Sequence, residues 1–346
     1  MAYTTIKNPG DYFQTELWSA QDTSIDTINF APDWVWIKSR TNADTQILFD
    51  RVRGANKRLS SSGTSAESTT SDELTAFNSD GYTLGTGSNV NRSGNNYVSW
   101  NWKAGTGQGS SNTDGSINTT YTSVNTTAGF SISKFTGTGA NATVGHGLGA
   151  VPKMIIVKNL IDTEPWVVYH AGIDATAPQD YHLRLNTTDA RVNEAEVWND
   201  TAPTSSVFSL GSSGAPNGSG DATIAYCFAE KTGYSKFGSY VGNGNADGTF
   251  VYTGFKPAWV MVKNTNNASA DWTMFDVKRS TNNIMDKRLR ANLANAEDAP
   301  LGFIDFTSNG FKWRTDSFAV NGSGNTHVFM AFAEQPLVGD NPATAR

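Results

Sequence analysis

Residues 30–38 read FAPDWVWIK, and the pattern returns as AVPKMIIVK at residues 150–158 and as FKPAWVMVK at residues 255–263. Each copy places a proline before a run of large apolar residues and ends on a lysine. Proline fits the first position of a strand because it has no N–H to donate to a ladder. The apolar runs have the length of strands and are bounded by turn residues, so they predict three strands buried on both faces.

A second pattern follows each of these strands. It pairs a Gly-containing turn with a β-branched and aromatic run, as NRSG at 91–94 with YVSWNW at 97–102, NGSG at 217–220 with TIAYCF at 223–228, and NGSG at 321–324 with HVFMAF at 327–332. From the lysine of the first pattern to the last glycine of the second there are 56, 62 and 61 residues. Such constant spacing is the mark of an internal repeat. It predicts three tandem units of roughly 100 residues each.

The fold expected for each unit is an antiparallel β-sandwich. In the middle unit, strands are predicted at residues 130–136, 142–146, 153–159, 165–170, 181–186, 206–210 and 222–229. Seven short strands at this spacing are typical of jelly-roll or lectin-like sandwiches. Residues 65–77 and 188–198 are expected to hold a turn or a short helix. The predicted organisation is repeat 1 at 1–104, a Gly/Ser/Asn-rich linker at 105–118, repeat 2 at 119–233, repeat 3 at 234–336 and a tail at 337–346.

Composition excludes several classes of protein. No apolar run approaches the roughly 20 residues that span a bilayer, and the N-terminus shows no signal peptide. The formal net charge of −6 opposes a nucleic-acid binder, which needs a basic surface. The single cysteine, Cys227, cannot form an intrachain disulfide and is expected to be a buried, inert thiol. We therefore expect cytosolic assembly, without nucleic acid or membrane insertion.

No catalytic or metal-binding pattern stands out. The four histidines show no helical metal-ligand spacing, and the segment 145–149 lacks the lysine and serine or threonine of a phosphate loop. Asp50 and Asp276 recur at one offset in the first and third units, with His170 at that offset in the middle unit, and all three are expected to form turns. The sequence thus predicts no enzyme, no metal and no cofactor.

Candidate binding residues come from two features. Basic residues cluster after one strand of the first unit, at Arg51, Arg53, Lys57 and Arg58, and at the matching place in the third, at Lys278, Arg279, Lys287, Arg288 and Arg290. They indicate either a solvated hairpin or a contact with an acidic partner, such as a protein subunit or an anionic glycan. Trp198 and Trp313 lie among polar residues, so they are the tryptophans that could be exposed as a sugar-binding face or a protein hot spot.

The chain also resembles a family of tailed-phage virion proteins. The motifs that carry the resemblance are PDWVWIK (32–38), VRG (52–54), SDGY (79–82), WNWKAG (100–105), TAGFSI (127–132), ATVGHGL (142–148), PKMIIVK (152–158) and NDTAPT (199–204). They extend over nearly the whole chain. Members of this family, frequent in phages of marine bacteria and cyanobacteria, are often named tail fibre or virion structural protein. The resemblance implies a place in the virion and transfers no catalytic residue.

Two functions remain open. The first is a tail fibre or receptor-binding adhesin that grips a host-surface glycan or protein. The second is a capsid decoration protein or tail adaptor that stabilises the particle. Either would be assembled in the host cytoplasm with other virion proteins and is expected to form a homo-oligomer, with a trimer favoured. An enzyme such as a capsule depolymerase is a third reading, but the sequence cannot place two carboxylates together for it.

Overall fold

The computed structural model describes residues 4–20, 22–339 and 342–343, and the chain is all-β. Every ladder between the named strands is antiparallel. Within these residues the helices are single turns, namely α1 (Ser88–Asn91), α2 (Ala195–Trp198), α3 (Gly214–Asn217) and α4 (Phe318–Asn321), with 3-10 turns η1 (Pro9–Asp11) and η2 (Pro178–Asp180). The predicted all-β, antiparallel class is confirmed.

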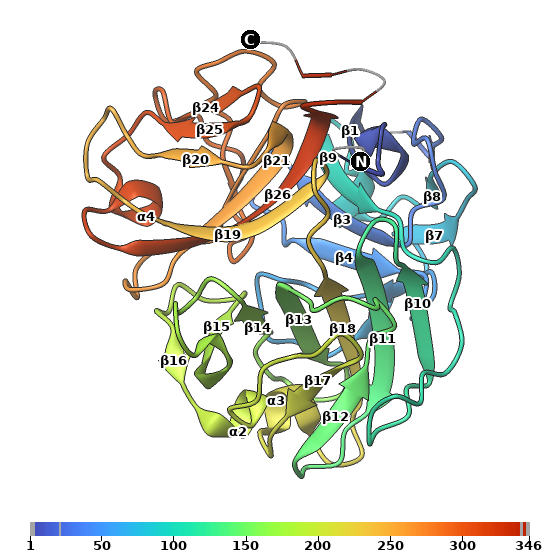
Figure 1. The fold of residues 1–346 in the computed structure, drawn as a ribbon. Helices are drawn as coiled ribbons and strands as arrows, with labels where there is room; N and C mark the ends of the chain where they lie inside the picture. The colour runs from blue at the N-terminus through green and yellow to red at the C-terminus, as the bar shows by residue number, and fades with distance from the viewer. Residues whose placement is uncertain (1–3, 21, 340–341, 344–346) are drawn as a thin grey trace.

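Three large sheets form the body of the molecule, one from each third of the chain (Figure 1). The first has the order β1 (Phe13–Ser19), β9 (Asn96–Trp102), β3 (Trp34–Ser39), β4 (Ile47–Asp50). The second has the order β10 (Tyr121–Asn125), β11 (Phe130–Thr136), β18 (Ala222–Phe228), β13 (Met154–Asn159), β14 (Val167–His170), β15 (Tyr181–Arg184), β16 (Val192–Asn193). The third has the order β19 (Ser235–Val241), β26 (Thr326–Pro336), β21 (Phe255–Asn264), β22 (Thr273–Asp276), β23 (Leu289–Arg290). We call the parts of the chain that form them the first, second and third units.

Equivalent positions in the three units follow from strand register. Trp34 of β3 pairs with Asp50 and Trp102. Met154 of β13 pairs with His170 and Phe228, and Trp259 of β21 pairs with Asp276 and Phe332. Asp50, His170 and Asp276 therefore correspond, and residues at equal offsets from them can be compared across the units.

Smaller sheets cover the outer faces of the large ones. They are β2 (Ser24–Ile25), β8 (Tyr82–Leu84) and β7 (Leu74–Phe77) in the first unit, β12 (Ala142–Gly145) and β17 (Val207–Leu210) in the second, and β20 (Phe250–Tyr252), β25 (Gly310–Trp313) and β24 (Ile304–Thr307) in the third. The first unit adds the two-stranded β5 (Lys57–Arg58) and β6 (Ser68–Thr69). Every residue of β3, β13 and β21 is buried, which confirms the prediction of strands covered on both faces.

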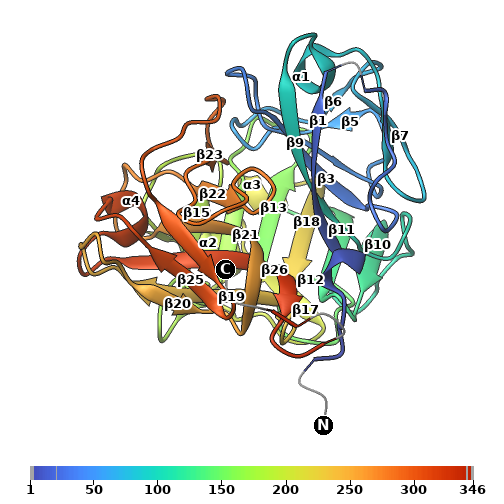
Figure 2. The ribbon, with the colours of Figure 1, turned by 90° about the horizontal axis from the view of Figure 1, so that it is seen from above.

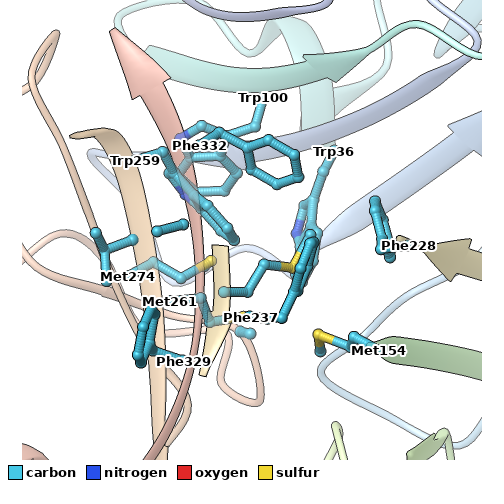
Figure 3. Close-up of a cluster of buried hydrophobic side chains, with 14 of the residues drawn as sticks. Trp36, Trp100, Met154, Phe228, Phe237, Trp259, Met261, Met274, Phe329 and Phe332 are labelled. Atoms are coloured by element: carbon cyan, nitrogen blue, oxygen red, sulfur yellow. The ribbon is translucent and has the colours of Figure 1, made fainter. Parts of the chain in front are cut away.

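The inner faces of the large sheets meet in one aromatic core, part of which Figure 3 shows. Trp34 of the first unit stacks on Tyr226 of the second, with ring centroids 4.6 Å apart. Phe332 of the third unit lies 5.7 Å from Trp102 and 6.2 Å from Phe228. Because Trp102, Phe228 and Phe332 correspond, the same position of each unit reaches the centre. The units therefore share a core, and separating one of them exposes aromatic surface of the others.

Backbone hydrogen bonds close three seams between the units in a cyclic order. The N–H of Glu67 donates to Leu160 O (3.0 Å), that of Arg191 to Thr265 O (2.9 Å), and that of Glu297 to Arg40 O (2.9 Å). Each acceptor is the residue that follows β13, β21 or β3. The first unit thus donates to the second, the second to the third and the third to the first. The three units surround a common centre in the view of Figure 1, and seen from above the second unit lies behind the other two (Figure 2).

Side chains repeat the cycle in the opposite sense. Four residues before Asp50, His170 and Asp276 lie Gln46, Trp166 and Trp272. Their side-chain N–H groups donate to Arg290 O, Ser60 O and Arg184 O, respectively, at 2.8, 2.8 and 2.9 Å. At matching places, each seam therefore has a backbone bond in one direction and a side-chain bond in the other.

The predicted linker at 105–118 lies along the surface and is held by hydrogen bonds. The buried carboxylate of Asp33 accepts the backbone N–H groups of Ala104, Thr106 and Gly107. Farther along, Ser110 and Thr122 form a β-bridge. Of the predicted tail, residues 340–341 and 344–346 lie outside the described residues.

The strands predicted for the second unit agree closely with the observed ones. All seven exist, and their boundaries differ by at most two residues. The segment 188–198 ends in the turn α2, while the segment 65–77 forms the strands β6 and β7 instead. Two strands of the second unit were not predicted: β10, an edge strand with the polar sequence YTSVN, and the two-residue β16 within the segment 188–198.

Candidate functional site

The basic clusters of the first and third units are internal ion-pair networks. Arg53 Nε lies 2.5 Å from Asp50 Oδ2, and Arg53 Nη1 lies 3.2 Å from Glu67 Oε2. Arg279 Nε and Nη1 make the corresponding contacts with Asp276 and Glu297 at the same distances. The side chains of Asp50, Arg53, Asp276 and Arg279 are fully buried. Their charges are satisfied inside the protein and are closed to an external partner.

Each buried aspartate also reaches into the next unit. Asp50 Oδ2 accepts the hydroxyl of Tyr226 at 2.7 Å, and Asp276 Oδ2 accepts Nε1 of Trp100 at 3.1 Å. Their Oδ1 atoms accept the backbone N–H of Arg53 and Arg279, so the expected turn-forming role is confirmed. The same carboxylate therefore shapes the turn, pairs with arginine and joins two units.

The second unit uses a histidine at this position. His170 Nδ1 accepts the backbone N–H of Gly172 at 3.0 Å. Its Nε2 lies 3.1 Å from the carbonyl oxygen of Phe329 in the third unit, and since a carbonyl can only accept, Nε2 carries the proton. Burial lowers the pKa of His170 to about 4, so the ring is neutral near neutral pH. Ile173 stands where the other units have the buried arginine.

The remaining predicted basic residues divide into paired and exposed ones. Arg51 donates to Pro32 O and Asn78 O, Lys57 to Thr69 Oγ1, Arg58 to Glu73, and Arg288 to Asp298. Lys278 is exposed and Lys287 is half-buried. The expected acidic partner is thus within the chain for most of the cluster. The partners are Glu67, Glu73, Glu297 and Asp298, which lie 10 to 18 residues from the arginines they contact, in the same unit.

Trp198 and Trp313 are core residues, so the prediction that they could be exposed as a binding surface is wrong. Only 2% of Trp198 is exposed, and its ring meets Tyr169 edge-on with centroids 6.1 Å apart. Trp313 is fully buried against Phe311 and Phe275. It lies on β25, where alternation turns Lys312 and Arg314 outward and the indole inward. The turn α2 orients Trp198 inward in the same way, despite its polar neighbours.

Buried titratable groups elsewhere serve the structure. Lys38, Lys158 and Lys263, the lysines of the repeated pattern, each donate to two backbone carbonyls, and burial lowers their pKa values to about 8. Cys227 is buried as predicted, which raises its thiol pKa. Among the described residues no group of three or more His, Cys, Asp or Glu side chains could hold a metal ion, and none of the helices there could span a membrane.

Exposed apolar side chains identify a surface that the sequence analysis missed. Phe250 and Tyr252 of β20 are 44% and 56% exposed, while Val251 between them is buried. The sequence signal for this surface was the segment TFVYT at 249–253. Successive side chains of a strand point to opposite faces, so Phe250 and Tyr252 lie on the face opposite Val251. Lys312 pairs with Asp247 at 2.7 Å beside these rings. We take this outer sheet of the third unit as the candidate recognition surface.

A family described as a domain of unknown function, DUF7483, matches residues 8–336. The match extends over nearly the whole chain, so the protein belongs to that family. No curated protein matches the chain.

Proposed function

We propose that this member of the DUF7483 family is a structural protein of a bacteriophage virion and acts as the receptor-binding lobe of a tail fibre. The virion assignment rests on the motifs quoted above, among them PDWVWIK and WNWKAG. The protein would be assembled in the host cytoplasm with other virion proteins, and the proposal gives it no catalytic role.

One observation carries the adhesive role. Six of the ten large apolar residues that are exposed in the described chain belong to the third unit, namely Val241, Phe250, Tyr252, Ile284, Leu301 and Phe318. Of these, Phe250 and Tyr252 are neighbours on the exposed face of β20, and adjacent exposed apolar side chains on a soluble protein often mark a surface that binds a partner. The first and second units together contribute three. The third unit is therefore the proposed contact with the host surface, through a glycan or a protein.

We also propose that the three units are tandem β-sandwich repeats of jelly-roll or lectin-like type. The shared order of the large sheets and the matching bonds at the three seams support this assignment. A shared origin accounts for residues at one offset making equivalent contacts in each unit. Repeated sandwiches with covered cores give a rigid body that suits the outside of a particle.

The cyclic seams favour a second candidate, a capsid decoration protein or tail adaptor. A chain whose units donate to one another in a closed cycle presents three related surfaces around one centre. Such a body could sit over a threefold position of a particle as one chain, or form the homotrimer that the sequence analysis favours. Light scattering on the purified chain distinguishes a monomer from a trimer.

Immunogold labelling of intact virions with antibody against this chain tests the proposal. Gold at the tail tip or along fibres supports the adhesin. Gold spread over the head replaces it with the decoration protein. Purified particles that bind no gold, from a lysate in which the chain is present, contradict both.

A further inference from the structure

The outer sheet of the third unit has two rows of residues on the face opposite its buried one, of which Phe250 and Tyr252 are exposed and Asp305 and Gly310 are buried. Strand pairing places Phe250, Lys312 and Asp305 in one row and Tyr252, Gly310 and Thr307 in the next. Residues directly opposite one another in a sheet point to the same side. The other side carries Val251, Phe311 and Phe306, all buried. The six residues of the two rows therefore form one face, which we call the platform.

Two aromatic rings give the platform its apolar area. A Cβ atom on Gly310 would lie 3.1 Å from Cζ of Phe250 and 2.1 Å from the carbonyl oxygen of Val251. The ring of Phe250 thus leans across the glycine toward the row of Tyr252. Since glycine leaves that space open, the two rings can present adjacent apolar surface.

The polar groups at the platform edge balance one another. Lys312 Nζ lies 2.7 Å from Asp247 Oδ1, and Arg314 Nε lies 2.6 Å from Asp305 Oδ2. Asp247 is the most exposed of the four, with 77% of its side chain accessible. Two cations and two carboxylates leave little net field, so this face favours a ligand without charge. Asp247 and Lys312 still offer an acceptor and a donor at the surface.

At the corresponding positions, all of them described, the other units have no aromatic pair. Val251 corresponds to Val144 of β12 and Ile25 of β2, which are both buried. Its exposed neighbours correspond to Thr143 and Gly145 in the second unit and to Ser24 and Asp26 in the first. The aromatic pair is therefore particular to the third unit and is not needed to build the outer sheet.

We propose that the platform binds a neutral glycan, with pyranose rings lying on Phe250 and Tyr252. One face of a pyranose carries mostly C–H groups, which suit an aromatic surface, while its hydroxyls point sideways toward donors and acceptors such as Lys312 and Asp247. This inference rests on the proposed adhesive function and names the class of receptor. Binding at one platform is weak, and several copies on a virion raise the avidity.

The test uses the full chain and a panel of immobilised bacterial surface polysaccharides, neutral and anionic, read by biolayer interferometry. We expect the wild type to bind a neutral member and the Phe250→Ala/Tyr252→Ala variant to lose affinity at least about tenfold. Phe250→Tyr, which keeps the ring, should retain binding. Phe318→Ala is the matched control, because Phe318 is a 48% exposed aromatic of the same unit outside the platform. Circular dichroism and thermal unfolding verify that each variant folds.

Three results overturn the inference. They are equal binding by the wild type and the double variant, binding confined to anionic polysaccharides and abolished by salt, and adhesion of the wild type to host cells without binding to any polysaccharide. The last leaves the adhesive function standing with a protein receptor. By contrast, gold labelling confined to the head contradicts the adhesive function itself. Failure of the glycan inference can therefore be distinguished from failure of the proposed function.

Discussion

The second unit closes its seam with a neutral histidine where the first and third units use a buried ion pair. Asp50 and Asp276 each carry a charge that Arg53 or Arg279 compensates inside the core. His170 occupies the same register without a charge, beside Ile173. All three side chains accept a backbone N–H in their own turn and bond to the neighbouring unit.

The difference shows what the seam requires. It needs a side chain with two polar ends, one for the local turn and one for the next unit. Charge is optional, but once an aspartate is chosen, an arginine must accompany it because a lone buried charge is costly. The two solutions respond differently to mutation and to pH.

The largest expected effect comes from removing one charge of a pair. Asp276→Ala leaves Arg279 buried beside Glu297 alone and takes the acceptor from Trp100. We expect the free energy of unfolding to fall by about 3–5 kcal/mol. Urea denaturation followed by tryptophan fluorescence measures it. Asp316→Ala, an exposed aspartate of the same unit, is the control and should change little.

A double variant sharpens the result. Asp276→Asn with Arg279→Met removes both charges and keeps an amide oxygen for the turn. It should be more stable than Asp276→Asn alone, because the buried arginine that has lost its aspartate partner is no longer present. If the double variant is the less stable of the two, the pair contributes more than compensation of a buried charge.

In the second unit, we expect the free energy of unfolding to depend on pH through His170, by an amount similar to the effect of removing one charge of the pair. The folded-state pKa of His170 is about 4 against an ordinary value of 6.5, so the unfolded chain binds the proton more readily. The contribution of His170 to the free energy of unfolding is fully present above pH 6.5. It is lost as the pH falls toward 4, which lowers the free energy of unfolding by roughly 3 kcal/mol. His182 and His327 are also lowered to about 4 and act in the same direction. The test measures the free energy of unfolding of the wild type and of His170→Gln between pH 4 and 6.5. If the two pH profiles are parallel, His170 is not the source of the pH dependence.

A smaller effect is expected at the tryptophans that bond across the seams. Trp166→Phe and Trp272→Phe keep most of the buried ring and remove the indole N–H that Ser60 O or Arg184 O accepts. Arg184 O keeps the long bond from the N–H of Thr187, at 3.5 Å. Each should cost about 1–3 kcal/mol in thermal or urea unfolding. The two values should agree, since the positions correspond. A loss at one seam only would show that the seams are not energetically alike.

The smallest effect is expected at the basic residues left outside the networks. Lys278→Ala with Lys287→Ala should change the unfolding free energy by less than about 0.5 kcal/mol. Incorporation of this variant into particles, measured by quantitative immunoblot, then tests whether any acidic partner remains for the cluster. If the variant is as stable as the wild type but is not incorporated, these two lysines do contact an acidic partner in the particle.

Much of the fold could be predicted because its signals are local. Proline, an apolar run and lysine recur at constant spacing, and short strands between turn residues can be located to within two residues. The burial of Trp313 could also have been predicted, because the charged residues Lys312 and Arg314 flank it in a strand and point to the opposite side. Trp198 was harder, because a single helical turn sets its direction.

The sequence by itself determined the all-β class and most of the strands, since periodicity and turn chemistry act over a few residues. Only the tertiary structure decided which carboxylates pair with the buried arginines. Glu67 lies 14 residues from Arg53, and Glu297 lies 18 residues from Arg279, on loops whose positions depend on the whole unit. The bonds from Asp50 to Tyr226 and from Asp276 to Trp100 join residues 176 apart in each case. Such contacts arise when three sheets turn their inner faces to one core, because burial forces every polar group there to find a partner.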